Sequence, residues 1–345
     1  MIDIKPPIKL DHLKALTDDT GILQHTKYSI PNRKEGYTTD DNARALVACL
    51  KFLQLHDNSD VSKLVNTYLS FLFHMQRPDG KFHNLLSYDR DFLDDMGSED
   101  CMGRSLWACG YTTLTGPTQG IKTTAKEILD KGFQYASNFK SPRAKAFTIL
   151  GLCNYYQAFP YDHNLPKNIV SFTEQMLDIY QQMSSSDWCW FEPYLTYVNA
   201  RLPQAFFKAH NIIGNSKYLQ VAKESFDFLV EVQMIDGKFV PIGNRGWYQK
   251  GGQRAIYDQQ PIEASCMMEA SLAGFQATNE KKYQKIANIA FEWFLGKNTK
   301  NVVVYDSTTG ACHDGINPQG LNLNQGAEAT ISYLLARLEL EKIGQ

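Results

Sequence analysis

The sequence predicts an all-α fold, a closed ring of six helical hairpins called an (α/α)6 toroid. Six almost wholly apolar segments recur at intervals of roughly 45–65 residues, which is typical of a repeated supersecondary unit. These segments alternate with others that carry a single apolar stripe. Apart from the short run VVVY at 302–305, no segment shows the alternating β-branched residues of a strand.

The six apolar segments are predicted to be the inner helices of the ring. A helix that is apolar on every side must be buried on every side. The segments are rich in small residues, and most open on a carboxylate, an amide or an arginine. They begin near Gly36, Gly97, Ser141, Thr196, Asp258 and Asn322.

The intervening segments are predicted to be outer helices, because each has one apolar face and one polar face. In residues 217–233, Tyr218, Val221 and Leu229 share a face, and Lys223 lies opposite. Similar stripes occupy residues 62–76, 123–139, 166–183 and 281–295, and a short helix is expected at 9–16. This alternation predicts a single domain over residues 1–345, with a two-domain helical solenoid as the alternative.

Composition excludes several classes of partner. A hydrophobic fraction of 43% and a charged fraction of 21% are those of a soluble globular protein. A net charge of -2 and a pI near 6.5 give no electrostatic case for nucleic acid or for an anionic membrane. We see no signal peptide, no membrane span and no CxxC pair among the seven cysteines. We therefore expect a reduced, cytoplasmic protein.

The starts of the inner helices are where a functional site is expected. Every inner helix follows an outer one, so their N-termini should point the same way. Their unpaired N–H groups and positive dipole ends then gather at one rim. Carboxylates placed there would be held ionised, and an oxygen-rich ligand would find many donors.

Acidic pairs open the first two inner helices. Asp40 and Asp41 are followed by Arg44. Paired carboxylates can divide acid and base roles, although helix capping and a local salt bridge explain one pair equally well. A second pair at an equivalent position is harder to explain by capping alone. It consists of Glu99 and Asp100, with Arg104 one turn later.

Further carboxylates lie near the later inner helices. Glu192 in WCWFEP has apolar neighbours of the kind that raise a carboxyl pKa, which suits a general acid; a loop residue paired with Arg201 is the alternative. Asp258 and Glu263 open the fifth inner helix, where Pro261 fits the first helical position. Helix capping is again the alternative for these groups, and for Glu328 at the sixth helix.

Other kinds of site find little support in the sequence. His25, His313 and Asp314 have no close metal-ligand spacing, so we expect neither a metal nor a cofactor. No nucleophilic triad signature and no phosphate-binding glycine loop is visible. Trp190 and Trp247 lie in polar loops that lead toward inner helices, where a tryptophan is either a plug or a stacking platform for a sugar ring.

Five motifs carry a resemblance to a known family: TDDTGILQH, GYTTDDNARAL, GSEDCMGRSLWA, YDQQPIEA and HDGINPQGLNLNQGAEAT. The chain resembles an (α/α)6 toroid family of the six-hairpin glycosidase type. It is similar to domains fused behind GT-B glycosyltransferases, and to stand-alone bacterial proteins associated with mannoside-processing enzymes. The resemblance covers nearly the whole chain and implies a sugar pocket at the N-terminal rim. A glycosyltransferase or a mannoside phosphorylase of the same pathway is the partner it implies.

The first hypothesis is therefore a glycoside hydrolase acting on an oligosaccharide that contains mannose. One carboxylic acid protonates the leaving oxygen, and a second carboxylate activates water or attacks the anomeric carbon. The catalytic pair is expected among Asp41, Asp100, Glu192 and Asp258. Substrate contacts are expected from His25, Tyr37, Asp40, Arg44, Glu99, Arg104, Trp190, Trp247, Gln259, Glu263, His313, Asp314, Gln325 and Glu328.

Two alternatives stay open. A sugar epimerase or isomerase needs a histidine base, and His25 and His313 are the histidines in motif-like contexts. A non-catalytic carbohydrate-binding domain that assists a glycosyltransferase is the other. The acidic pairs argue against it, since binding a neutral sugar does not demand so many carboxylates.

Overall fold

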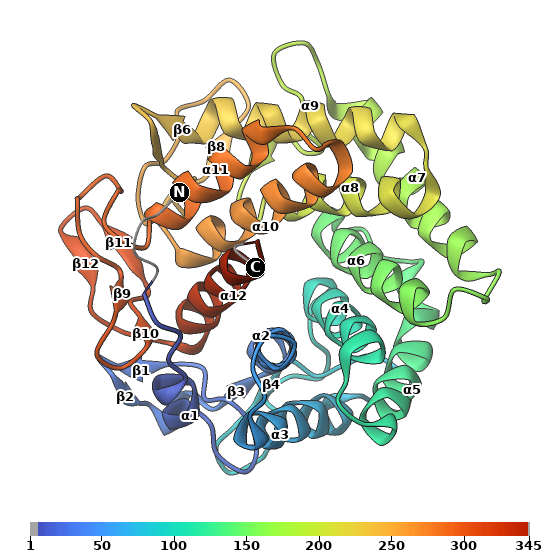
Figure 1. The fold of residues 1–345 in the computed structure, drawn as a ribbon, viewed down its shortest axis with the longest axis vertical. Helices are drawn as coiled ribbons and strands as arrows, with labels where there is room; N and C mark the ends of the chain where they lie inside the picture. The colour runs from blue at the N-terminus through green and yellow to red at the C-terminus, as the bar shows by residue number, and fades with distance from the viewer. Residues whose placement is uncertain (1–5, 344–345) are drawn as a thin grey trace. The chain divides into compact units, whose positions relative to one another are not determined.

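The structure is a computed structural model that describes residues 6–343, and most of these residues are helical. The chain divides into two compact units. The first unit is Leu13–Phe172, and the second combines Met1–His12 with Thr173–Gln345. Figure 1 shows the helices and strands of both. The single domain that the alternation of helices predicts stays a prediction.

In the first unit, three helices predicted to be inner stand side by side. They are α2 (Thr39–Leu53), α4 (Glu99–Thr115) and α6 (Pro142–Ala158). The middle helix, α4, packs against both neighbours (Figure 1). Two helices predicted to be outer, α3 (Ser59–Met75) and α5 (Gln119–Ala136), pack on α2 and α4 and also contact each other. The short helix α1 (Asp11–Leu16) precedes them.

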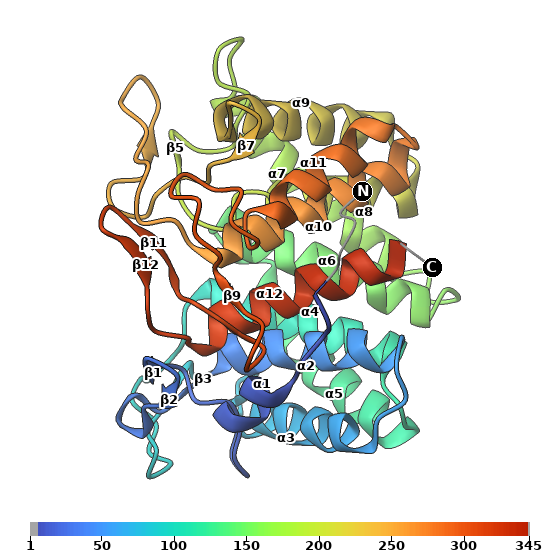
Figure 2. The same ribbon diagram turned by 60° about the vertical axis from the view of Figure 1, so that its left-hand side comes forward.

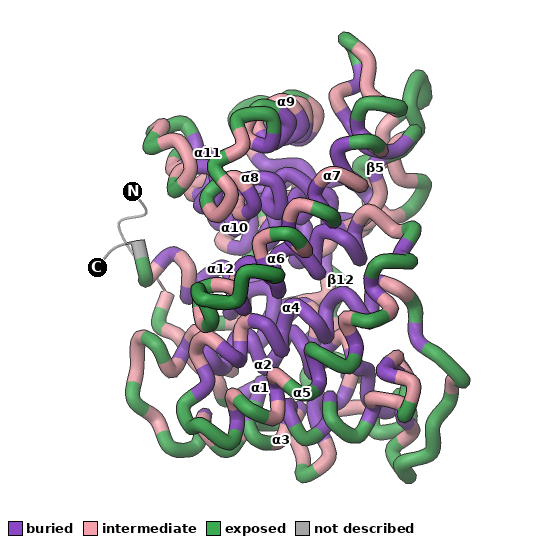
Figure 3. Tube along the Cα trace, turned by 90° about the vertical axis from the view of Figure 1, so that its right-hand side faces the viewer, coloured by how far each residue is buried: buried purple, intermediate pink, exposed green. Residues whose placement is uncertain are grey.

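Burial separates the two kinds of helix, as the sequence predicts. Every residue of α4 from Asp100 to Gly110 is buried, polar ones included. In α5 only one stripe is buried, and the opposite face is open to solvent. Figure 3 shows the same contrast along the chain.

Glycines let α4 and α6 approach each other closely. A Cβ atom on Gly110 would lie 2.2 Å from the carbonyl oxygen of Gly151, and one on Gly151 would lie 2.5 Å from the carbonyl oxygen of Leu106. Side chains larger than hydrogen do not fit at these positions. The small residues of the apolar segments therefore set the spacing between these two inner helices.

The second unit repeats the pattern. The helices α8 (Arg201–Ile213), α10 (Pro261–Thr278) and α12 (Ala327–Ile343) correspond to the remaining inner segments. α10 packs against both α8 and α12, while α9 (Ser216–Gln233) covers α8 and α11 (Lys281–Glu292) covers α10 (Figure 2). The helix α7 (Leu165–Met183) runs across the boundary between the units.

Short antiparallel strand pairs lie in the loops that precede inner helices. In the first unit, β1 (Thr26–Lys27) pairs with β2 (Ile30–Pro31), and β3 (Tyr37–Thr38) pairs with β4 (Leu85–Leu86). In the second unit the pairs are β5 (Tyr194–Leu195) with β8 (Tyr248–Gln249), β6 (Met234–Ile235) with β7 (Lys238–Phe239), β9 (Tyr305–Asp306) with β10 (Ala311–Cys312), and β11 (Gly315–Asn317) with β12 (Gly320–Asn322). Of the VVVY run, only Tyr305 enters a strand.

Helix starts agree with the sequence except at two inner helices. Ser141 is the N-cap of α6, and Pro261 is the first residue of α10, as predicted. The fourth inner helix begins at Arg201 and not at Thr196, because the Asn199 side chain bonds both the N–H and the carbonyl of Thr196 in a turn. The sixth begins at Ala327, because the residues before it form β12 and a loop. Among the described residues, no helix is long and apolar enough to cross a membrane.

Candidate functional site

Hydroxyl caps fix the starts of the three inner helices in the first unit. Thr38, Ser98 and Ser141 each accept a hydrogen bond from the N–H three residues on. Side chains of the first turns then link neighbouring helices, so the three N-termini lie at the same end of this unit. For these three helices the predicted rim is present, and for all six it stays a prediction.

Asp40 lies in the first turn of α2, and 20% of its side chain is accessible to solvent. Its Oδ1 accepts a hydrogen bond from Arg104 Nη1 on α4 at 3.0 Å. Burial alone would raise the Asp40 pKa, but the positive charges of Arg104 and Arg44 outweigh it and hold the pKa below its usual value. Asp40 is therefore an ionised carboxylate that still reaches solvent.

Asp41 is more enclosed than its neighbour. Arg44 Nη1 lies 2.7 Å from Asp41 Oδ1, and the two side chains are 7% and 5% exposed. Thr38 Oγ1 donates to Asp41 Oδ2 at 2.8 Å. Both oxygens of Asp41 thus hold the first turn of α2, which is the local role that the sequence left open as an alternative.

The second acidic pair connects α4 to α6. Glu99 Oε2 accepts the backbone N–H groups of Lys140 and Ser141, each at 2.7 Å. Asp100 Oδ1 accepts a hydrogen bond from Ser141 Oγ at 2.6 Å, and Asp100 Oδ2 lies 3.9 Å from Arg104 Nη2. Arg104 therefore lies between Asp40 and Asp100 and links two of the predicted carboxylates.

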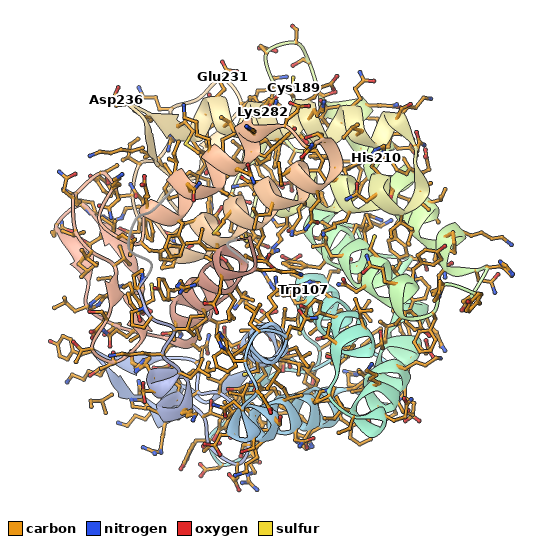
Figure 4. All side chains as sticks on the ribbon, viewed as in Figure 1. Trp107, Cys189, His210, Glu231, Asp236 and Lys282 are labelled. Carbon is orange, nitrogen blue, oxygen red and sulfur yellow. The ribbon has the colours of Figure 1, made fainter. Side chains whose placement is uncertain are left out.

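Aromatic rings pack against the guanidinium of Arg104. The Arg104 guanidinium carbon lies 5.0 Å from the centre of the Phe147 ring, a cation–π contact. Phe147 in turn packs against Trp107, whose ring centre is 5.7 Å away. Figure 4 shows Trp107 extending from α4. These contacts fix the side chain that orients Asp40.

The two other predicted substrate contacts of the first unit, Tyr37 and His25, lie in the segment before α2. Tyr37 is 1% exposed, and its hydroxyl donates to Asp18 Oδ2 at 2.6 Å. Burial, with this acceptor, raises the Tyr37 pKa well above its usual value, so the side chain belongs to the loop packing. His25 is exposed just before β1, and its backbone carbonyl accepts the N–H of Asn32.

Sequence reasoning missed three polar residues of this rim. Asn84 Nδ2 lies 3.4 Å from Asp40 Oδ2. Arg143 and Lys145 lie in the first turn of α6 and are 3% and 4% exposed. Burial lowers the Lys145 pKa, although Glu99 nearby opposes that shift. The sequence feature that could have revealed Arg143 and Lys145 is the presence of two cations inside the otherwise apolar segment PRAKAFTIL.

In the second unit, Glu192 is 8% exposed and lies in an aromatic environment. Its backbone carbonyl accepts the indole N–H of Trp188 at 2.7 Å. Trp190 is 0% exposed and packs edge-on against Phe191, with ring centres 5.3 Å apart. Because no face of the Trp190 ring is open, it is a core plug in this structure and not a sugar platform.

Trp247 is the more open of the two tryptophans. It is half-buried in the loop before β8, and its ring centre lies 6.0 Å from that of Tyr197. Arg254 fastens this loop, because its guanidinium donates to the backbone carbonyls of Val232, Val240 and Pro241. Burial lowers the Arg254 pKa to about 10.

The residues that precede and open α10 have distinct partners. Gln259 Oε1 accepts the indole N–H of Trp293 at 2.9 Å, and Glu263 Oε1 accepts the N–H of Val198 at 2.5 Å. Asp258 Oδ1 is shielded from solvent and accepts no hydrogen bond from the described residues. A buried acceptor left unpaired is costly, so this oxygen is suited to a hydrogen bond from a ligand hydroxyl.

Two histidines flank Gln325 near the start of α12. His12 Nε2 lies 2.7 Å from the Gln325 carbonyl oxygen, and His313 Nε2 lies 3.4 Å from Gln325 Nε2. Gln325 Nε2 also donates to Asp306 Oδ2 at 3.2 Å. Burial lowers the His12 pKa despite the backbone bond to Gln325 and the nearby carboxylates.

The two remaining predicted contacts also lie by α12. Asp314 Oδ1 accepts the N–H of Gly326 at 2.6 Å, and Glu328 stands in the first turn of α12. An ion pair that the sequence did not reveal joins α8 to α10. Arg201 Nη2 lies 2.5 Å from Glu269 Oε2, and the side chains are 4% and 3% exposed. The alternative pairing of Glu192 with Arg201 stays a prediction.

A metal centre has no candidate in the part of the chain that the structure describes. No three His, Cys, Asp or Glu side chains come together there as potential ligands. The chemistry available at both groups of residues is that of carboxylates, guanidinium groups, amides and imidazoles. Such groups bind hydroxyls and transfer protons.

Comparison with solved structures identifies the fold. The chain is similar to a cellobiose 2-epimerase from Bacillus thermoamylovorans, with a TM-score of 0.75 and 12% identity over 96% of each chain. It is similar to a D-mannose isomerase, with a TM-score of 0.73 and 12% identity over 96% of this chain and 94% of the other. A family GH76 α-mannanase from Bacteroides thetaiotaomicron gives a TM-score of 0.68 and 12% identity over 96% and 93%.

These similarities confirm the predicted (α/α)6 toroid fold. At this level of identity they show the fold alone. All three proteins are named as enzymes of carbohydrate chemistry, while the predicted link to glycosyltransferases stays a prediction. No protein-family model matches the sequence, and no curated protein matches it.

Proposed function

We propose that this protein is a glycoside hydrolase that cleaves an oligosaccharide with a pair of carboxylates. The observation that carries the proposal is the acidic rim of the first unit. There Asp40 and Asp100 flank the guanidinium of Arg104, at 3.0 and 3.9 Å. Hydrolysis of a glycosidic bond needs one carboxyl group that gives a proton and one that activates water or attacks the anomeric carbon.

Asp40 suits the role of the ionised partner. Arg104 and Arg44 hold its pKa below the usual value, so it is deprotonated at neutral pH. A carboxylate in this state can accept a proton from water or stabilise positive charge at the anomeric carbon. Asp40 thereby joins the four carboxylates that the sequence proposes as catalytic.

Asp100 is the proposed proton donor beside Asp40, and Asp41 is the remaining candidate base of this unit. In the second unit, Glu192 and Asp258 are the carboxylates that the sequence proposes as catalytic. Asp258 has the most telling environment, because its Oδ1 is buried and accepts no hydrogen bond from the described residues. An acceptor in such surroundings is suited to a hydrogen bond from a substrate hydroxyl. Trp247 and Tyr197, whose rings lie 6.0 Å apart, are proposed to stack on a sugar ring.

Mannose is the proposed sugar. Two of the similar structures are named for it, an α-mannanase and a D-mannose isomerase. We propose the cytoplasm as the location, and an enzyme of the same mannoside pathway as the partner. Both proposals rest on the sequence resemblance.

The test is incubation of the protein with α- and β-linked manno-oligosaccharides, followed by chromatography of the products. The proposal predicts release of a shorter sugar. It also predicts a loss of about 10²- to 10⁴-fold in kcat when a catalytic acid or base is replaced. The variants are Asp40→Asn, Asp41→Asn, Asp100→Asn, Glu192→Gln and Asp258→Asn. Asp19→Asn, at an exposed carboxylate of the first unit, is the control that should keep full activity.

An epimerase or isomerase is the second candidate, and a specific observation favours it. His12 and His313 both lie against Gln325, and several similar structures are sugar epimerases or isomerases. A histidine base would exchange a substrate proton with solvent. Deuterium uptake from heavy water into a free monosaccharide, lost in His313→Gln, would support this activity over hydrolysis. Tight glycan binding without either reaction would support a binding domain.

A further inference from the structure

One amide side chain of the first unit is fastened to Asp40 at several points. Asn84 Oδ1 accepts the backbone N–H of Asp40 at 3.3 Å, and Asn84 Nδ2 lies 3.4 Å from Asp40 Oδ2. The carbonyl oxygen of Asn84 also accepts the N–H of Thr39 at 2.9 Å. The start of α2 is therefore bound to a residue 44 positions later in the chain.

Asn84 is itself held from the opposite side. Its backbone N–H donates to Asp94 Oδ2 at 2.8 Å, and the next N–H, of Leu85, donates to Asp94 Oδ1 at 3.0 Å. Leu85 then pairs with Thr38 in the β3–β4 ladder. Gly97 packs on Asn84, since a Cβ on Gly97 would lie 3.0 Å from Asn84 Cβ. The amide can hardly turn away from Asp40 without disturbing these contacts.

The two oxygens of Asp40 are thus oriented by different groups. Arg104 binds Oδ1 and provides a positive charge, whereas Asn84 binds Oδ2 as a neutral donor and orients the carboxylate. An arginine alone leaves a carboxylate free to rotate about its contact. Two donors on different oxygens, from α4 and from the loop before it, fix its plane.

We propose that Asn84 is a positioning residue that holds Asp40 in the orientation needed to act on the substrate. This inference rests on the proposed function, because it assigns Asp40 a part in the reaction. Asn84 acts through Asp40 and through the start of α2. The reaction rate depends on the position of each reacting group, and a displacement of about 1 Å lowers the rate about 100-fold.

Several charged or titratable groups contact Asp40 or the residues next to it and must be considered in any pH measurement. Arg44 comes from its own helix, and Arg104, Asp100 and Cys101 come from α4. The loop before α4 contributes Asp94, which also influences Cys101, and His83, whose carbonyl accepts the hydroxyl of Thr39. Because these groups are unchanged in an Asn84 variant, a shift in Asp40 titration reports the lost amide.

The experiment follows Asp40 directly by ¹³C NMR of side-chain carboxyl groups, with the signal assigned by its loss in Asp40→Asn. Asn84→Ala removes both side-chain bonds. Asn84→Asp keeps an acceptor for the Asp40 N–H but places a second carboxylate beside Asp40. We expect the Asp40 pKa to rise in Asn84→Ala and to rise further in Asn84→Asp, because a like charge disfavours ionisation.

Activity gives the second readout. We expect kcat to fall about 10- to 100-fold in Asn84→Ala with little change in KM, and the acid limb of the kcat/KM profile to move up with the Asp40 pKa. Asn154→Ala is the matched control, since that half-buried amide donates to the carbonyl of Leu150 in its own helix. It should leave the Asp40 signal and the pH profile unchanged.

The outcomes separate this inference from the proposed function. If Asp40 titrates identically in the wild type and both folded Asn84 variants, the inference is overturned whatever the activity. If the Asp40 signal shifts as expected but the protein hydrolyses no oligosaccharide, Asn84 does position Asp40 and only the hydrolase proposal fails. A loss of kcat that is equal at every pH, with an unshifted Asp40 signal, would also overturn the inference.

Discussion

Arg104 of α4 donates a hydrogen bond to Asp40 of α2 at 3.0 Å, and its side chain is only 6% exposed. Its second terminal nitrogen faces Asp100 at 3.9 Å. One buried guanidinium therefore joins two helix starts and sets the charge state of the carboxylate that we propose as catalytic.

Replacing Arg104 with methionine should destabilise the protein by about 3 kcal/mol. Removing one partner of a buried ion pair leaves the other charge uncompensated, and this effect exceeds the value of the pair itself. Urea denaturation measures the change. Arg90→Met is the control, because Arg90 pairs with Asp19 at the surface, where the side chains are 59% and 82% exposed. Its stability should stay close to that of the wild type, and equal losses in the two variants would refute the expectation.

The stability contributed by Asp40 should disappear in acid. The folded-state pKa of Asp40 lies below the ordinary value of 3.8. A depressed pKa contributes stability that is fully present above the unfolded-state pKa, and that stability is lost as the pH falls through the folded-state pKa. The free-energy difference between the wild type and Asp40→Asn should thus be constant above about pH 5 and should decrease below about pH 4. Urea denaturation across that range tests this, and a difference that grows in acid would mean a raised pKa.

The glycine contact between α4 and α6 should not tolerate a methyl group. The Cβ of Gly110→Ala would lie 2.2 Å from a backbone oxygen. We expect a cost of about 3 kcal/mol from overpacking, which outweighs the gain of about 1 kcal/mol that alanine has over glycine in a helix. Gly120→Ala in α5, where a Cβ has nothing within 4 Å, should be neutral or stabilising. Thermal denaturation of the two variants measures both changes in stability. A Gly110→Ala protein as stable as the wild type would contradict the close packing of α4 and α6.

The two tryptophans should separate stability from binding. Trp190→Ala should cost about 3–5 kcal/mol of stability, because the ring is fully buried. Trp247→Ala removes a half-buried ring and should mainly weaken sugar binding, by about 1 kcal/mol or about fivefold in affinity. Calorimetric titration with an oligosaccharide and urea denaturation measure both effects. Weaker binding in a stable Trp190→Ala protein would restore the platform role for that residue.

The periodicity of the sequence was sufficient to predict the helices and their classes. A helix that is buried on all sides is apolar all round, and a helix that is buried on one side has a single apolar stripe. The burial of α4 and α5 agrees with these two sequence patterns. Helix starts were predictable where a local signal exists, as with Ser141 and Pro261. They were missed where a side-chain turn at Asn199 or a hairpin before Ala327 delays the helix.

The site was only partly predictable, since its contacts join residues distant in the chain. The motif around Asp40 pointed to the first rim cluster, but nothing local links Asp40 to Arg104 or to Asn84. Nor does any spacing pair Arg201 with Glu269. The two tryptophans occupy similar polar loops in the sequence, and only packing shows that Trp190 is fully enclosed while Trp247 is half-buried.

The central claim is tested most directly by the products formed from manno-oligosaccharides by the wild type and by Asp40→Asn. The account predicts that the wild type shortens the oligosaccharide and that Asp40→Asn, although folded, is slower by at least about 100-fold. An unaltered oligosaccharide with the wild type, or undiminished cleavage by Asp40→Asn, would contradict it.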